Sequence, residues 1–109
     1  MAKFDSEIVA LVAYAEITGG NPPTFVLNRG FSAIVRNGVG DYTLTLESNE
    51  GLSDANMQSF VSVKGTAPLE TAVEHVDGTN LRVRALDNAG AAQEVSFVIE
   101  VKRPTNSFN

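Results

Sequence analysis

The sequence of 109 residues lacks cysteine and tryptophan and contains a single histidine, His75. Without cysteine there are no disulfides and no thiolate chemistry. The sequence therefore does not indicate whether the protein works in a reducing or an oxidising compartment. One histidine and no cysteine cannot supply a multi-histidine or Cys/His zinc site within one chain, although copies of His75 around a symmetric oligomer axis could. We therefore expect no metal and no cofactor, and we interpret His75 as a surface or partly packed side chain.

Basic residues are also scarce, because eight Lys and Arg stand against thirteen Asp and Glu, which gives a formal net charge of −5. Nucleic-acid binding requires a clustered basic face, so we expect no nucleic-acid partner. No apolar stretch approaches the length of a membrane span, and the most apolar segment, residues 8–15, lies between Glu7 and Glu16. The start of the chain lacks the positive charge of a signal peptide. The sequence therefore predicts a soluble, unprocessed protein that is made in the cytoplasm and has no membrane partner.

Sequence signatures of catalysis are absent as well. There is no Gly-x-Ser-x-Gly elbow and no phosphate-binding glycine loop, and the turn aspartates lack the spacing of an EF-hand. The carboxylates fall in turns or at solvent-facing strand positions, where charge is the expected background. A Ser/His/Asp triad would need His75 together with a serine that nothing in the sequence marks. We predict that the chain is not an enzyme and has no catalytic residue.

What the sequence does contain is a period-two alternation of apolar and polar residues, which is typical of half-buried strands. The alternation is clearest in residues 41–47 (DYTLTLE), 81–86 (LRVRAL) and 94–102 (EVSFVIEVK). Weaker strands are expected at residues 58–64 and 70–76, and an apolar run occupies residues 31–35. The positions that this pattern assigns to the core include Tyr42, Leu44, Val83, Phe97 and Ile99.

Turn residues separate these segments. Residues 77–80 (DGTN) predict a tight hairpin with positive φ that pairs residues 70–76 with 81–87. Residues 87–90 (DNAG) predict the same kind of turn before the last strand, and residues 48–57 are interpreted as a polar loop. The pattern as a whole predicts an all-β fold: one antiparallel β-sandwich domain over residues 1–109, jelly-roll-like or immunoglobulin-like, with about seven or eight strands.

Residues 7–18 (EIVALVAYAEIT) differ from the other segments because they are apolar on both strand faces. Their β-branched content and the Gly/Pro-rich stretch that follows favour a strand, with a helix as the alternative because Ala, Leu and Glu are helix formers. A strand that is apolar on both faces must be covered on both, so the second cover is either a neighbouring subunit or the core of an unusually thick domain. We expect residues 1–20 to form an assembly strand or arm and residues 104–109 to form a C-terminal tail. The expected assembly interface comprises Val9, Leu11, Ala13, Ile17 and Phe108.

Two stretches of the chain, residues 35–47 (VRNGVGDYTLTLE) and 81–103 (LRVRALDNAGAAQEVSFVIEVKR), resemble a β-sandwich module of bacteriophage virion proteins. The positions that fit the first half of this pattern are Arg36, Gly38, Gly40, Tyr42, Leu44 and Leu46. The positions that fit the second half are Val83, Asp87, Gly90, Phe97, Ile99 and Val101. Most of these residues set turns or fill the core, so the resemblance bears on the fold more than on the role.

The resemblance implies a structural protein that cements or decorates a phage capsid by clamping neighbouring shell subunits. It implies a place on the outside of the virion, the major capsid protein of a phage as partner, and a homo-oligomer, trimer first and dimer second. Relatives of the module also form receptor-binding knobs of head or tail fibres, which is the alternative. Residues 1–30 do not follow a collagen-like or coiled-coil stalk pattern, and this favours decoration over a fibre tip.

Overall fold

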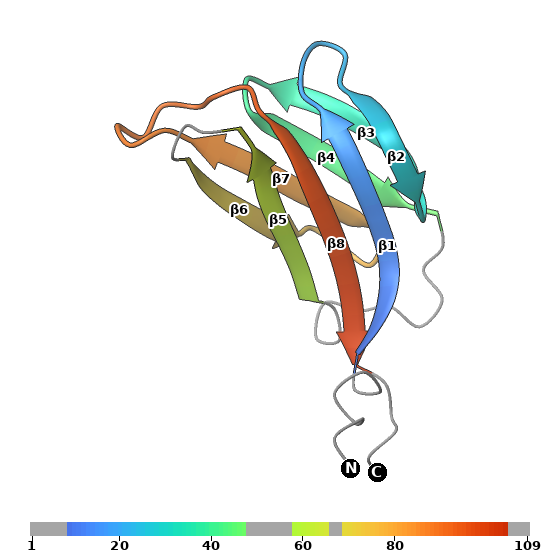
Figure 1. The fold of residues 1–109 in the computed structure, drawn as a ribbon. Coiled ribbons are helices and arrows are strands. Elements are labelled where there is room, and N and C mark those ends of the chain that lie inside the picture. Colours follow the sequence, from blue (N-terminus) through green and yellow to red (C-terminus); the bar gives the residue numbers. More distant parts are fainter. Residues whose placement is uncertain (1–8, 48–57, 66–68, 105–109) are drawn as a thin grey trace.

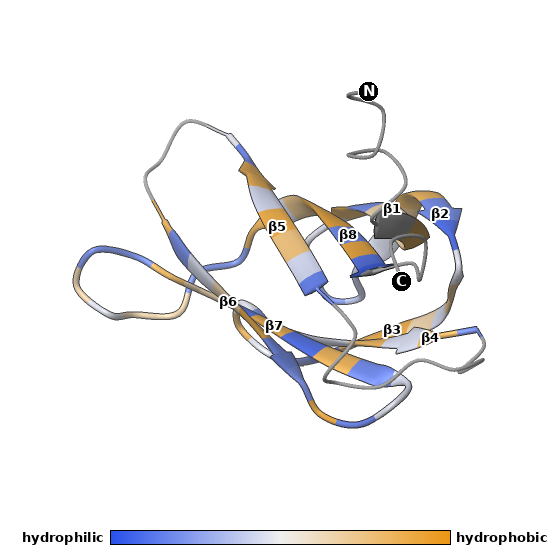
Figure 2. Cartoon of the chain, turned by 90° about the horizontal axis from the view of Figure 1, so that it is seen from below, coloured by the Kyte–Doolittle hydropathy of each residue, from blue (hydrophilic) through white to orange (hydrophobic). Residues whose placement is uncertain are grey.

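The computed structural model describes residues 9–47, 58–65 and 69–104 of the chain. In this part, eight antiparallel strands form two four-stranded sheets, ordered β2-β1-β8-β5 and β3-β4-β7-β6. The sheets lie face to face as two layers (Figures 1 and 2). The predicted all-β sandwich is confirmed. No described segment forms a helix that could span a membrane.

Each sheet combines strands that are distant in the sequence. The first sheet contains β1 (Val9–Thr18), β2 (Thr24–Arg29), β5 (Gln58–Lys64) and β8 (Ser96–Pro104). The second sheet contains β3 (Phe31–Gly38), β4 (Asp41–Leu46), β6 (Glu70–His75) and β7 (Asn80–Leu86). Residues 7–18 were expected to favour a strand over a helix, and β1 is that strand. The loop expected at residues 48–57 lies outside the described residues.

The core lies between the two sheets and is built from the apolar positions of the alternating strands. The five predicted core residues are all fully buried: Tyr42, Leu44, Val83, Phe97 and Ile99. The rings of Tyr42 and Phe97, which belong to opposite sheets, pack with their centroids 5.6 Å apart. Because alternate residues of a strand point to opposite faces, one buried face in each sheet fixes the register of the whole strand.

One strand of the fold, β2, is not predicted by the sequence. Its apolar residues Phe25, Val26 and Leu27 are consecutive, so the segment shows no period-two alternation. The structure explains the pattern by a β-bulge, because Glu16 pairs with Leu27 and Ile17 pairs with Phe25, which leaves Val26 as the extra residue. A bulge inserts one residue and thereby reverses which side chains face the core.

The two predicted turns have different outcomes. β6 and β7 pair as expected, but their turn is held by the Asp77 carboxylate, which accepts 2.9 Å hydrogen bonds from the backbone N–H groups of Thr79 and Asn80. Gly78 is not among the described glycines with positive φ, so that part of the prediction is wrong. Gly90 does have positive φ (85°), yet β7 and β8 lie in different sheets. The turn at residues 87–90 forms as predicted, because the Gly90 N–H donates to the Asp87 carbonyl at 3.0 Å and Leu86 forms an antiparallel bridge with Ala92. The chain crosses to the other sheet only after this turn, before β8 begins.

The Glu94 carboxylate links the two sheets at one end of the sandwich. Glu94, just before β8, accepts hydrogen bonds of 2.8 Å from the Gly40 N–H, the Tyr42 hydroxyl and Nε of Arg36. The Gly40 bond, followed by those from Tyr42 and Arg36, lowers the pKa of the Glu94 carboxyl, while burial raises the pKa of Tyr42. Gly40 has a φ of 62°, and a Cβ there would lie 2.3 Å from the Gln93 carbonyl oxygen. Only glycine fits this position, which ties the β3–β4 hairpin to the start of β8.

The first and last strands run side by side in the middle of their sheet. β1 and β8 pair from Val9 with Pro104 to Ile17 with Phe97. The described ends of the chain therefore lie together at one pole of the sandwich, where β1 and β8 extend as a two-stranded ribbon (Figure 1).

Candidate functional site

The outer face of the β2-β1-β8-β5 sheet carries exposed apolar side chains, and we call it the apolar face. Residues that pair directly across antiparallel strands share one face of the sheet. This rule and the observed register assign to the apolar face Leu11, Tyr14, Glu16, Leu27, Arg29, Gln58, Phe60, Ser62, Lys64, Val98, Glu100 and Lys102. Its large exposed hydrophobic residues are Leu11, Leu27 and Phe60, with exposed fractions of 52%, 54% and 50%.

The outer face of the β3-β4-β7-β6 sheet carries more polar and charged side chains with hydrogen-bond partners, and we call it the polar face. The register assigns to it Ala33, Val35, Asp41, Thr43, Thr45, Glu70, Ala72, Glu74, Asn80, Arg82, Arg84 and Leu86. Its large exposed hydrophobic residues are Val35 and Leu86, with exposed fractions of 56% and 36%. Arg82 donates two hydrogen bonds to the Asp41 carboxylate, of 2.9 Å from Nε and 2.6 Å from an Nη. This contact lowers the pKa of Asp41 and raises that of Arg82. The Thr45 hydroxyl donates to the Asn80 side chain at 2.8 Å.

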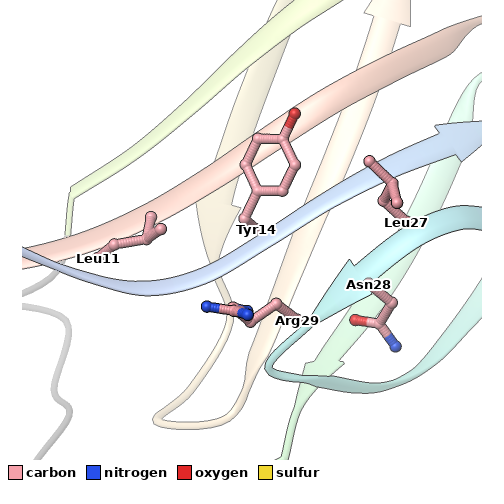
Figure 3. Close-up of a pocket in the computed structure, with 5 residues that line it drawn as sticks. All are labelled: Leu11, Tyr14, Leu27, Asn28 and Arg29. Carbon is pink, nitrogen blue, oxygen red and sulfur yellow. The ribbon is translucent and has the colours of Figure 1, made fainter.

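A pocket of about 370 Å³ opens on the apolar face where β2 ends beside β1. Its lining residues are Leu11 and Tyr14 of β1 and Leu27, Asn28 and Arg29 of β2. Figure 3 shows Leu11, Tyr14 and Leu27 projecting to the same side of the sheet, while the Arg29 side chain extends along β1 towards the end where Leu11 lies. The Asn28 amide is already used, because it exchanges hydrogen bonds of 2.9 and 3.1 Å with the backbone of Phe31. The pocket thus has apolar walls and one cationic side.

Arg29 differs from its charged neighbours because it has no ion-pair partner among the described residues. On the same face Lys64 pairs with Glu16, and Lys102 lies 3.8 Å from a Glu100 oxygen and 5.6 Å from the centroid of the Phe60 ring. The apolar face therefore has three cations and two carboxylates, a net charge of +1, whereas the whole chain carries −5.

Part of the β1 backbone beside this pocket is an open sheet edge. β2 pairs with β1 only from Tyr14 to Thr18, so residues 9–13 pair with β8 alone in the described part of the chain. Gly30 covers residues 12 and 13 closely, since a Cβ on it would lie 2.9 Å from both the Val12 carbonyl oxygen and Ala13 Cβ. The open stretch is therefore residues 9–11, next to the Arg29 end of the pocket.

The lone histidine joins the two sheets at their other edge. Nε2 of His75 in β6 lies 2.8 Å from Oγ of Ser59 in β5, so the structure identifies the serine that the sequence could not mark. No carboxylate of the described residues is bonded to the ring of His75, so the arrangement required for a Ser/His/Asp triad is incomplete there. What the geometry provides is a polar link between two edge strands that do not share a ladder.

The expected assembly interface is only partly accessible. Ala13 and Ile17 are fully buried in the core, so their assignment to an interface is wrong. The cause is a bulge at Val12: Leu11 pairs with Lys102 and Ala13 with Val101, so Leu11 faces outwards while Ala13 faces the core. Leu11 is exposed and lines the pocket. Val9 pairs with Pro104 at the chain-end pole, and Phe108 lies outside the described residues.

The sequence analysis did not identify the other residues of the apolar face. Tyr14, Leu27, Arg29 and Phe60 were not proposed as binding residues, although the two apolar faces of residues 7–18 were a usable signal that one side of β1 is uncovered. Within the described residues there is no cluster of three or more His, Asp or Glu side chains that could hold a metal ion. Comparison with known proteins gives no match to a family model, to a curated protein or to a solved structure.

Proposed function

We propose that this chain is a structural protein that decorates and cements a bacteriophage capsid, and that it docks onto the shell through the apolar face. The observation that supports docking is the pocket on the apolar face, which is lined by the exposed side chains of Leu11 and Leu27, while Phe60 is a third half-exposed hydrophobic residue on the same face. Contiguous exposed apolar surface on a small protein is a feature of binding sites. The phage assignment rests on the resemblance of residues 35–47 and 81–103 described above.

The mechanism of such a protein is mass action. A protein that binds only the assembled shell stabilises it, since dissociation of the shell must also release every bound copy. Several copies linked in an oligomer would add effective concentration at each site. The oligomeric state stays a prediction, with a trimer expected first and a dimer second. Sedimentation velocity of the purified protein measures it.

Copy number and heat resistance test the proposal. Quantitative mass spectrometry of purified particles from the phage that encodes the chain is expected to find copies comparable in number to the shell subunits. Particles stripped of the protein should release their DNA at a lower temperature than complete particles, and adding the protein back should restore resistance. Absence from the particle, or equal heat resistance with and without the protein, would contradict the cementing role.

A receptor-binding knob of a head or tail fibre is the second candidate. The observation in its favour is the chain-end pole, because a domain whose described ends lie together can be mounted on a fibre from that side. A few copies per particle, located on fibres by immunogold labelling, would select this candidate over capsid cement.

A further inference from the structure

We propose, on the basis of the docking function above, that the pocket beside Arg29 binds an extended acidic segment of the partner protein. A carboxylate of that segment pairs with the Arg29 guanidinium, and an apolar side chain two residues away packs on Leu11 and Tyr14. The two recognised groups belong to residues i and i+2, because alternate residues of an extended chain face the same way.

Charge argues for the carboxylate. Arg29 has no ion-pair partner in the described part of the chain and lies among apolar side chains. Covering this pocket with a purely apolar partner would bury an unpaired charge, which is strongly unfavourable. A carboxylate accepts two parallel hydrogen bonds from a guanidinium, so one Arg suffices to recognise it. A polyanion such as DNA requires many cations, and the chain as a whole is negative.

The backbone argues for an extended segment. Among the described residues, no strand pairs with the outer side of the β1 edge at residues 9–11, and β2 ends at Arg29, opposite Tyr14. Added strands at open edges gain main-chain hydrogen bonds, while side-chain pockets supply specificity. The Arg29 side chain extends along β1 towards Leu11, which belongs to the open edge where such a segment would bind (Figure 3).

The probe that tests this is a library of random linear peptides displayed on a carrier, selected on the intact protein and counter-selected on Arg29→Glu. The expected result is enrichment of Asp or Glu at one position with an apolar residue two positions away. Enriched peptides synthesised individually should bind Arg29→Glu at least about tenfold more weakly than the original protein, since a desolvated charge pair is lost. Arg29→Met, which keeps the apolar stem, should lose acid selectivity.

The matched control is Arg84→Glu, a reversal of an exposed arginine on the polar face, 3.7 Å from Glu74. It should leave peptide affinity within about twofold, because exposed pairs contribute little and this one is remote from the pocket. Both variants should keep the original circular dichroism spectrum. No enrichment, enrichment without an acidic position, or equal binding by Arg29→Glu would overturn the inference. Enrichment of a motif found in this chain, with self-association that Arg29→Glu abolishes, would make the occupant a second copy and also overturn it.

The capsid experiment distinguishes this failure from failure of the proposed function. If the protein binds shells and Arg29→Glu binds them equally well, the docking function stands and the acidic-segment inference fails. If the protein is absent from particles while the library still yields the acidic motif, the site stands as a binding site and the capsid role fails.

Discussion

The two outer faces of the sandwich cover the same core, yet they differ in how their side chains are satisfied. On the polar face Arg82 donates hydrogen bonds to Asp41, and the Thr45 hydroxyl donates one to the Asn80 side chain. On the apolar face three large hydrophobic residues are about half exposed and Arg29 lacks a partner within the described chain. A surface whose polar groups already have partners gains little from a second protein, whereas an apolar surface with an unmatched charge gains from one. The difference supports the proposal that the apolar face is the docking side.

The largest expected change in stability comes from a substitution in the core that the two sheets share. Phe97→Ala should lower the free energy of unfolding by about 3–5 kcal/mol, because it removes a fully buried ring that packs on Tyr42. Val98→Ala, one residue along on the half-buried apolar face, is the control and should cost less than about 1.5 kcal/mol. Urea denaturation measures both variants. A loss below about 1 kcal/mol for Phe97→Ala would mean that the register of β8 is wrong.

A pair of matched substitutions tests the contrast between the faces directly. Leu27 and Val35 are equally exposed, at 54% and 56%, on the apolar and polar faces respectively. Leu27→Asp should weaken capsid binding at least about tenfold, because a charge replaces buried apolar contact in the complex. Val35→Asp should leave binding unchanged, and cosedimentation with stripped shells measures both. Equal losses for the two variants would remove the distinction between the faces.

The carboxylate that closes the end of the sandwich gives a smaller effect on stability. Glu94→Gln weakens the contacts with Arg36, Gly40 and Tyr42, and it should cost about 1–2 kcal/mol after allowance for solvent screening. Glu74→Gln, whose recorded ion pair is with Arg84 at 3.7 Å, is the control and should cost less than about 0.5 kcal/mol. If chemical denaturation shows the two variants equally stable, Glu94 does not tie β8 to the β3–β4 hairpin.

Lowering the pH should produce the smallest loss of folding stability per residue. The pKa of Asp77 is lowered to about 2, first by the Thr79 N–H, and the pKa values of Asp41, Asp87 and Glu94 are also lowered. The unfolded chain therefore binds more protons than the folded chain between about pH 4 and pH 2, so stability is present above this window and is lost as the pH falls through it. Asp77→Asn should flatten the decline in urea titrations at stepped pH. Constant stability between pH 4 and pH 2 would contradict this reading.

The sequence predicts the strands that alternate and fails where a bulge interrupts the alternation. Residues 41–47, 81–86 and 94–102 became β4, β7 and β8 because one face of each strand is buried and the other is not. β2 was missed, and Leu11 was grouped with Ala13, because the extra residues Val26 and Val12 reverse the facing of their neighbours. Nothing in the local sequence marks a bulge, since it depends on the register with another strand.

The pocket on the apolar face could be predicted only in outline, because it also depends on which strands lie side by side. The apolar residues on both faces of residues 7–18 indicated an uncovered surface, but the pocket requires Leu27 and Arg29 of β2 beside Leu11 and Tyr14 of β1. Whether Arg29 has an ion-pair partner among the residues that the structure describes depends on the whole arrangement and cannot be read from its neighbours in the chain. The same holds for the Ser59–His75 contact, which joins residues of different sheets.

The pairing of Val9 with Pro104 also determines how the protein would respond to mechanical load. Tension applied through these adjacent ends would pull two antiparallel strands apart, and because their hydrogen bonds lie perpendicular to the strands, the bonds would break one after another. Load that enters through the apolar face would instead be spread over Leu11, Leu27 and Phe60, which three different strands hold in place. We therefore expect the protein to resist force across its apolar face better than tension between Val9 and Pro104.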